Sequence, residues 1–256
     1  MTSRFIWENP LFQRKPAKTA EPPVFAIIAA AGSGSRMGLA LNKQFLKIGG
    51  IPVIVRSLNT LDRMSAISGL VVVAAAGDCA AMRDLLSDCR YNRLMGVTAG
   101  GATRQESVAR GLETLKTLAD PPADSTILIH DGARCFVTTA VVERVIAGIR
   151  QHRACGAAVP VKDTIKVADA SGQVITTPER SGLWAMQTPQ GALWHVLDKA
   201  YRLAGDRLSQ ATDDLAVLEQ AGQPVYLVLG DYANIKITTP EDLPVGEWLA
   251  AHQERG

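Results

Sequence analysis

The chain lacks the features that mark several large classes of protein. Only 5% of its 256 residues are aromatic, and its four cysteines show neither a C-x-x-C pair nor a zinc-ligand spacing. No apolar run approaches the ~20 residues that cross a bilayer. The formal net charge is only +2, so no polycationic nucleic-acid surface is indicated. Because cysteines without a disulfide or zinc pattern are typical of reducing compartments, we expect a cytoplasmic protein. From the low net charge and the absence of a long apolar run, we expect no nucleic-acid or membrane partner.

The composition favours an α/β fold. Hydrophobic residues make up 47% of the chain and are mainly aliphatic, which suits helices packed on a parallel sheet. From Val24 onward, apolar strands alternate with amphipathic helices. The pattern predicts a doubly wound, mostly parallel, Rossmann-like sheet forming one domain over 24–256. Residues 1–23 are rich in proline and mixed charges, and we predict a disordered leader; a transit peptide is the alternative interpretation.

Hydrophobic periodicity predicts the individual elements. Buried strands are expected over 24–31, 70–76, 93–98, 126–130, 157–161 and 225–229. Helices are expected over 51–63, 80–86, 103–118, 139–152, 191–203, 213–221 and 240–252, the third opening on the capping box Thr103-x-x-Glu106. Alternation over 164–167 and 174–175 around a turn containing Gly172 predicts a β-hairpin that interrupts the β/α rhythm.

The first strand runs directly into a glycine-rich loop, Gly32-Ser33-Gly34-Ser35-Arg36. Glycines let backbone N–H groups approach a phosphate chain, although the spacing fits neither the dinucleotide fingerprint nor a Walker A loop. An ordinary strand-to-helix turn is the alternative. Arg36 and the nearby Lys43 favour a triphosphate site, because two cations suit a phosphate whose negative charge grows during reaction.

A second candidate site follows the strand 126–130. Asp131 offers a hard oxygen ligand for Mg²⁺ bridging nucleotide phosphates, and a turn-forming aspartate is the alternative. Arg134 favours the functional interpretation because it could pair with a further phosphate. His130, at the strand end, is expected to be packed rather than catalytic.

The residues indicate no general base. A phosphate monoester has a second pKa near 6, so it is an anionic nucleophile at neutral pH and needs no deprotonation. The barrier then lies in bringing two anions together, which requires cations and a metal ion. The candidate cations are Arg36, Lys43, Arg134, Arg180 and Lys236. Taken singly, Lys236 could also be an edge-strand lysine, and Arg180 a surface arginine.

Seven short motifs occur in a characteristic order between about residues 25 and 249. They are Ala30-Ala31-Gly32-x-Gly34-x-Arg36-Met37, Lys43-Gln44, Gly100-Gly101-x-x-Arg104-x-x-Ser107-Val108, His130-Asp131-x-Ala133-Arg134, Thr188-Pro189-Gln190, Thr212-Asp213-Asp214 and Asn234-Ile235-Lys236-Ile237-Thr238. Together they resemble the 2-C-methyl-D-erythritol 4-phosphate cytidylyltransferase family. The resemblance implies transfer of CMP from CTP to that polyol phosphate, with release of pyrophosphate, in non-mevalonate isoprenoid biosynthesis.

The resemblance also implies roles for individual residues. Arg36 and Lys43 would stabilise the transition state, and Asp131 would hold Mg²⁺. Arg180 and Lys236 would position the phosphate of the acceptor. The CTP site would comprise Ala30, Ala31, Gly32, Gly34, Gly101 and Ser107, and the acceptor pocket Arg134, Thr164, Thr188 and Thr212. In this family the hairpin, residues 160–183 here, is an arm exchanged across a homodimer, so Thr164 and Arg180 would serve the neighbouring site.

The sequence departs from the family pattern at three positions. Ala29 and Cys135 replace prolines, and Ala102 stands where some relatives have an acid. None of the three removes a proposed charge. Two other functions remain open: a cytidylyltransferase for another polyol phosphate such as ribitol 5-phosphate, and a catalytically silent nucleotide-binding regulator.

Overall fold

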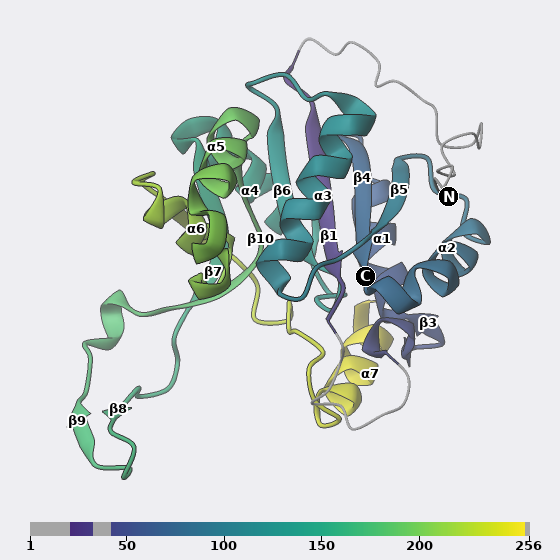
Figure 1. The fold of residues 1–256 in the computed structure, drawn as a ribbon. Helices are drawn as coiled ribbons and strands as arrows, with labels where there is room; N and C mark the ends of the chain where they lie inside the picture. The colour runs from purple at the N-terminus through teal and green to yellow at the C-terminus, as the bar shows by residue number, and fades with distance from the viewer. Residues whose placement is uncertain (1–20, 33–41, 254–256) are drawn as a thin grey trace.

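The computed structural model describes residues 21–32 and 42–253 (Figure 1). They contain a seven-stranded sheet in the order β11-β7-β10-β6-β1-β4-β5, as the doubly wound pattern predicts. β10 is antiparallel to both of its neighbours, and the remaining pairs are parallel. The strands are β1 (Val24–Ala30), β4 (Ile67–Ala74), β5 (Leu94–Ala99), β6 (Thr126–Asp131), β7 (Ala154–Pro160), β10 (Trp184–Leu193) and β11 (Tyr226–Leu229).

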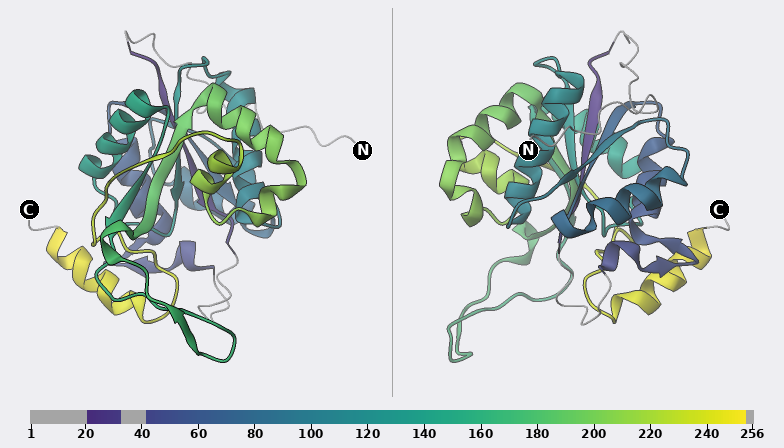
Figure 2. Two further views of the ribbon diagram at one scale, coloured as in Figure 1. Left: turned by 90° about the vertical axis from the view of Figure 1, so that its left-hand side faces the viewer. Right: turned by 45° about the vertical axis from the view of Figure 1, so that its right-hand side comes forward.

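Helices cover both faces of the sheet (Figures 1 and 2). They are α1 (Val53–Asp62), α2 (Cys79–Ser87), α3 (Arg104–Ala119), α4 (Thr139–His152), α5 (Trp194–Ala204), α6 (Asp214–Gln220) and α7 (Asp242–Gln253). Ala26 and Ile28 of β1 share a hydrophobic cluster with α1, α2 and α4, whereas Phe25 and Ile27 share one with α3, α5 and α6. β1 is therefore apolar on both faces, as a central parallel strand must be.

A third, smaller cluster lies beyond the end of the sheet. There α7 packs on the short hairpin of β2 (Lys47–Ile48) and β3 (Ile51–Pro52) (Figure 2). The buried residues of this cluster include Ile48, Phe136 and Ile237. Within the described ranges, no helix combines the length and apolar character needed to span a bilayer.

Threonine side chains cap two of the helices, one of them where the sequence predicts a cap. The side chain of Thr103 accepts a hydrogen bond from the Glu106 backbone N–H at 3.1 Å and so starts α3. Glu106 does not complete a full capping box, because its carboxylate accepts from the Ala102 N–H at 2.8 Å instead of from the N-cap residue. Thr138 caps α4 in the same way as Thr103 caps α3.

Two predictions about the second half of the chain were wrong. Residues 191–193 are the end of the central strand β10, and the helix predicted over 191–203 begins only at Trp194. The strand escaped detection because its middle is polar and contains Pro189, where the pairing with β7 shifts register. The strand predicted over 225–229 forms at residues 226–229 as the edge strand β11, but it is largely exposed rather than buried, with Leu229 54% accessible.

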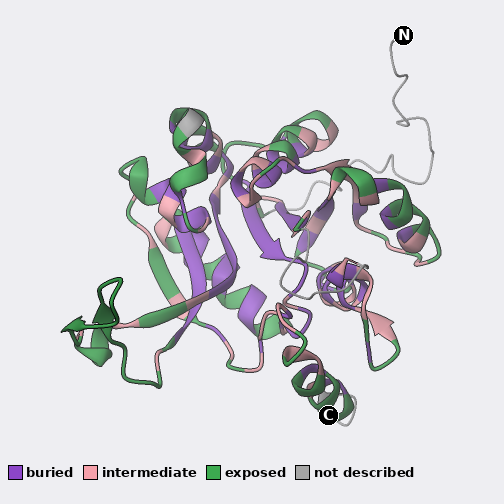
Figure 3. Ribbon diagram, turned by 60° about the horizontal axis from the view of Figure 1, so that its bottom comes forward, coloured by how far each residue is buried: buried purple, intermediate pink, exposed green. Residues whose placement is uncertain are grey.

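The predicted hairpin stands away from the body of the molecule (Figures 1 and 3). A backbone hydrogen bond from Val161 N to Leu183 O, 3.0 Å long, marks its base. Beyond it, β8 (Val167–Ala168) pairs with β9 (Val174–Thr176), and every residue of both strands is exposed. We call residues 161–183 the arm.

Gly191 allows β10 to pack closely at the centre of the sheet. A Cβ added there would overlap the backbone carbonyl oxygen of Ile127 in β6, which is fixed by the sheet. We expect Gly191→Ala to lower the free energy of unfolding by about 2 kcal/mol, as overpacking does, measured by urea unfolding. Gly77→Ala is the control, since its Cβ would meet no atom within 4 Å. Equal stability of the two variants would contradict the packing argument.

Candidate active site

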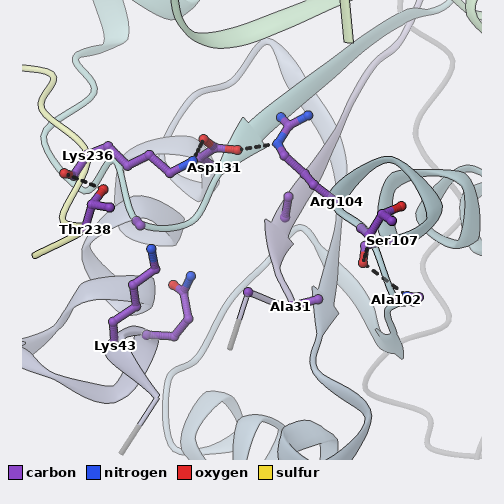
Figure 4. A pocket seen from close by; sticks show the side chains of 14 residues that line it. Ala31, Lys43, Ala102, Arg104, Ser107, Asp131, Lys236 and Thr238 are labelled. Carbon is purple, nitrogen blue, oxygen red and sulfur yellow. Dashed lines mark hydrogen bonds and ion pairs between the residues drawn. The ribbon is translucent and has the colours of Figure 1, made fainter. Parts of the chain in front are cut away.

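A cavity of about 530 Å³ opens at the carboxyl ends of the parallel strands (Figure 4). Segments following β1, β5 and β6 form its walls, and the turn at 43–45 and the loop before α7 complete it. This is the edge at which doubly wound folds bind ligands. The lining residues are Ala29, Ala31, Gly32, Lys43, Gln44, Gly101, Ala102, Thr103, Arg104, Ser107, Asp131, Ala133, Lys236 and Thr238.

Asp131 is the one carboxylate among these lining residues, and two cations engage it. Arg104 Nε lies 3.0 Å from Oδ1, and Lys236 Nζ lies 2.6 Å from Oδ2. The Asp131 side chain is only 9% exposed. Burial alone would raise the pKa of this carboxyl, but the charges of Arg104 and Lys236 outweigh burial and hold the pKa well below its usual range. Asp131 is therefore ionised and a very weak base at neutral pH.

Arg104 connects this carboxylate to a second one deeper in the protein. Its Nη2 donates to Asp214 Oδ2 at 2.7 Å, and the hydroxyl of Tyr201 donates to Asp214 Oδ1 at 2.7 Å. Asp214 is fully buried at the start of α6. The guanidinium of Arg104 thus bridges the cavity and the core; its contact with Asp131 on the cavity side is drawn in Figure 4.

Glycines and Ser107 shape the wall formed by β5 and α3. The Ser107 hydroxyl accepts from Gly101 N at 3.1 Å and donates to Thr103 O at 2.8 Å, which fixes the loop against the helix. A Cβ at Gly101 would overlap Glu106, so the close approach requires glycine. A Cβ at Gly32, across the cavity, would meet no atom within 4 Å. Among the described residues, none therefore fills the position of a side chain at Gly32.

Lys43 and Gln44 lie on a short 3-10 helix, Lys43–Phe45, whose N-cap is Asn42. The Asn42 side chain accepts from Gln44 N at 3.1 Å and donates to Asp78 Oδ2 at 2.7 Å, which ties the turn to the segment after β4. Lys43 is 7% exposed and Gln44 is 2% exposed. This packing places a largely buried ammonium group at the cavity.

A short hydrogen-bond relay fixes the backbone at Asp131. Its N–H donates to Thr188 Oγ1 at 3.0 Å, and Thr188 Oγ1 lies 3.0 Å from His130 Nδ1. His130 Nε2 lies 3.2 Å from the carbonyl oxygen of Arg134. Because a carbonyl can only accept, Nε2 must carry the proton and Nδ1 accepts from the threonine hydroxyl. His130 is neutral, fully buried and packed, as its sequence position indicates.

The guanidinium of Arg134 donates hydrogen bonds to two backbone carbonyl groups. Nη1 donates to Asn234 O at 2.8 Å and Nη2 to Met186 O at 3.1 Å. The Asn234 side chain in turn donates to Thr188 O at 2.9 Å. Arg134 and Asn234 thus join β10 to the loop that carries Lys236.

The structure brings seven of the fifteen predicted site residues together at the cavity. These are Ala31, Gly32, Lys43, Gly101, Ser107, Asp131 and Lys236. Six others do not line it in this chain: Ala30, Arg134, Thr164, Arg180, Thr188 and Thr212. Of these, Thr164 and Arg180 lie exposed on the arm. Gly34 and Arg36 lie outside the described residues.

Sequence reasoning did not assign several cavity residues, of which Arg104 matters most. The available signal was a charged residue in the first turn of a helix, directly after a strand and two glycines. Its partner Asp214 also gave a signal, as the second acid of Thr212-Asp213-Asp214. The others are Ala29, Gln44, Ala102, Thr103, Ala133 and Thr238.

Comparison with known proteins shows which family this chain resembles. A model of the 2-C-methyl-D-erythritol 4-phosphate cytidylyltransferase family matches residues 24–251. This chain belongs to that family. Similar relatives of that name include one from Desulforamulus reducens, 42% identical over 88% of this chain and 94% of the relative. Another, from Synechococcus sp., is 43% identical over 87% of this chain and 95% of the relative.

Solved structures agree with the fold. A crystal structure of 4-diphosphocytidyl-2C-methyl-D-erythritol synthase superposes with a TM-score of 0.75 at 31% identity, covering 91% of this chain and all of the other. The synthase of that name from Anaerococcus prevotii gives a TM-score of 0.76 at 29% identity, covering 96% of this chain and all of the other. The predicted fold class is thereby confirmed.

The buried His130 predicts a pH dependence of stability. Burial is the main cause that lowers its pKa to about 4. Between pH ~6.5 and ~4 the unfolded chain therefore binds more protons than the folded one, so stability falls as the pH falls, by about 3 kcal/mol over this range. Urea unfolding at pH 7 and pH 4.5 measures this slope.

We expect His130→Gln to lose most of that slope, whatever its stability at pH 7. His195→Gln is the control, because His195 is exposed and its ring Nδ1 contacts only the carbonyl oxygen of Ala123. A slope unchanged in His130→Gln would contradict the assignment.

Proposed function

We propose that the chain transfers CMP from CTP to 2-C-methyl-D-erythritol 4-phosphate and releases pyrophosphate. The product would be 4-diphosphocytidyl-2-C-methyl-D-erythritol, an intermediate of non-mevalonate isoprenoid biosynthesis. Because the reaction consumes CTP, we place it in the cytoplasm. The observation that carries the proposal is a cavity whose lining combines the lysines Lys43 and Lys236, the single carboxylate of Asp131 and two glycines.

This cavity suits a nucleophile that is already an anion. Both ring nitrogens of His130 are engaged in hydrogen bonds, so His130 does not serve as a general base. Asp131 does not serve as one either, because the charges of Arg104 and Lys236 hold its pKa well below its usual range. An acceptor phosphate needs no base. The work of the protein is then to hold two anions in line and to stabilise the charge that develops on the attacked phosphorus.

We assign that electrostatic work to lysine and arginine side chains. Lys43, with Arg36, stabilises the transition state and the leaving pyrophosphate, since Arg36 ends the glycine-rich loop and Lys43 follows it in the sequence. Lys236, whose ammonium group lies on the same side of the cavity as that of Lys43, positions the acceptor phosphate (Figure 4). Ala31, Gly32, Gly101 and Ser107 hold the nucleotide, with Ala30 and Gly34 completing the loop.

The residues present fit a Mg²⁺ ion. Mg²⁺ is commonly held by one or two carboxylates together with substrate phosphates and water, and Asp131 is the carboxylate that lines the cavity. The described residues offer no group of three or more acidic, histidine or cysteine ligands that would hold a metal alone. We therefore propose that Asp131 and CTP hold Mg²⁺ jointly. Bound there, the ion would neutralise phosphate charge.

We further propose a homodimer in which the arm of each subunit completes the site of the other. Among the residues that the structure describes, the Arg180 side chain donates one hydrogen bond, from Nη1 to the backbone carbonyl of Lys162 at 2.9 Å, and it does not line the cavity of its own chain. The arm also exposes large apolar side chains, including Val174 at 52% and Ile175 at 66%. Such exposure on a protruding segment is typical of an interface. Thr164 and Arg180 would then join Arg134, Thr188 and Thr212 around the acceptor.

Release of pyrophosphate tests the proposed function. The full chain is incubated with CTP and Mg²⁺ and with 2-C-methyl-D-erythritol 4-phosphate, ribitol 5-phosphate or no acceptor. We expect release that depends on the methylerythritol phosphate. Release only with ribitol 5-phosphate would favour the other polyol, and no release with any acceptor would favour a silent nucleotide-binding protein.

Lys43→Ala should lower kcat far more than it raises KM for CTP. Removing one donor from a transition-state site costs about 10²- to 10³-fold in kcat. Lys47→Ala is the control, because Lys47 is a nearby exposed lysine on β2 that does not line the cavity. A purely KM effect in Lys43→Ala would mean that the lysine contributes only uniform binding.

Mixed dimers test the exchanged arm. In a dimer of Arg180→Ala and Lys43→Ala subunits, one site would combine an intact Lys43 with an intact Arg180 from the neighbour. Co-refolding equal amounts should then restore about a quarter of the wild-type activity, because half of the dimers are mixed and each has one good site. Self-contained sites would give no recovery over the separate variants.

A further inference from the structure

Arg104 is held between two carboxylates of different kinds. Asp131 lies at the cavity, and Asp214 is completely buried behind it. The guanidinium reaches both, through Nε to Asp131 Oδ1 at 3.0 Å and through Nη2 to Asp214 Oδ2 at 2.7 Å. Arginine suits such a bridge because its donors form a rigid planar fork, which lysine lacks.

The inner end of this bridge is firmly anchored. Besides Arg104, Asp214 accepts from the Tyr201 hydroxyl at 2.7 Å, and its own N–H donates to Gln190 Oε1 at 3.0 Å. Arg104 itself is the first residue of α3, directly after the N-cap Thr103. Both ends of the Arg104 side chain are therefore fixed by the core.

Lys236 holds the other oxygen of Asp131 quite differently. Its side chain is 34% exposed and comes from a loop segment rather than from a helix or strand. Its Nζ makes one ion pair with the described residues, to Asp131 Oδ2. Of the two cations on Asp131, Arg104 is thus anchored by a second carboxylate, and Lys236 is the more exposed.

We infer that Arg104 is a positioning residue: anchored by Asp214, it holds Oδ1 of Asp131 in place. The other oxygen, Oδ2, then leaves Lys236 and binds a divalent cation carried by the nucleotide phosphates. This inference rests on the proposed nucleotide and metal site. Arg104 acts through Asp131 and does not itself bind the nucleotide. Loss of Arg104 or of its anchor should therefore weaken the metal contribution and leave the rest of nucleotide binding nearly intact.

The test compares CTP binding with and without Mn²⁺, measured by calorimetry on the full chain. Arg104→Lys keeps the charge but lacks the planar fork that reaches both carboxylates. Asp214→Asn removes the negative charge and one of the two acceptor oxygens of the anchor, at a residue that does not line the cavity. In each we expect the gain in CTP affinity that Mn²⁺ provides to fall by about 10- to 100-fold, as for other residues that orient metal ligands. Metal-free CTP affinity should change less than about threefold.

Coupling and control variants separate positioning from a general loss of structure. The double variant should lose no more than Arg104→Lys alone, since both changes break one bridge. Arg150→Gln is the control: this arginine also pairs with a carboxylate, Glu21 at 2.7 Å, but lies on α4 and does not line the cavity. Should Asp214→Asn fail to fold, Tyr201→Phe removes one hydrogen bond from the same anchor.

Several results would overturn the inference. If metal-free CTP affinity falls as much as the gain from Mn²⁺ does, Arg104 contacts the nucleotide. If the losses of the two single variants add up in the double variant, or if both variants behave like the wild type, no bridge operates. If wild-type protein gains no CTP affinity from Mn²⁺, the proposed metal site itself is wrong. Wild-type gain with unchanged variants refutes only the role of Arg104.

Discussion

The structure of the site depends on one buried charge, the carboxylate of Asp131. An ionised carboxyl that is 9% exposed must be paired, because an uncompensated buried charge costs several kcal/mol. Its partners, Arg104 and Lys236, lie 27 and 105 positions away along the chain. Three segments distant in sequence, namely the end of β6, the start of α3 and the loop before α7, must therefore converge on one point.

The polar middle of β10 makes this convergence possible. Thr188 accepts from the backbone of Asp131 through its hydroxyl and from the Asn234 side chain through its carbonyl, so it joins the strand end to the loop of Lys236. Gln190 accepts from Asp214 N and donates to Asp213, which orients the start of α6. Polar groups buried in a central strand are tolerated here because each is satisfied by a segment that carries a site residue.

Sequence reasoning succeeded where the signal is local and failed where it is distant. The apolar runs of β1, β4 and β6 and the cap at Thr103 depend on neighbours within a few residues, and they appear where predicted. β10 was missed because its polar residues are explained only by partners on other segments. Arg104 was left without a role for the same reason, since its partner Asp214 lies 110 positions away. Lys236 and Arg180 gained roles from the family resemblance and not from local pattern.

The cationic residues that line the cavity carry less charge than the two proposed substrates, so we expect further cations from segments that do not line it. The described lining carries three cationic side chains against one carboxylate, and one of the three, Arg104, is shared with buried Asp214. A triphosphate and a phosphate monoester together bring more negative charge than this excess balances. Gathering all the needed cations in an empty cavity would cost self-repulsion before any substrate bound. In the proposed dimer, cations carried on separate segments, such as Arg180 on the arm, would avoid that cost, because they would join the site only when the arm packs against a neighbouring subunit.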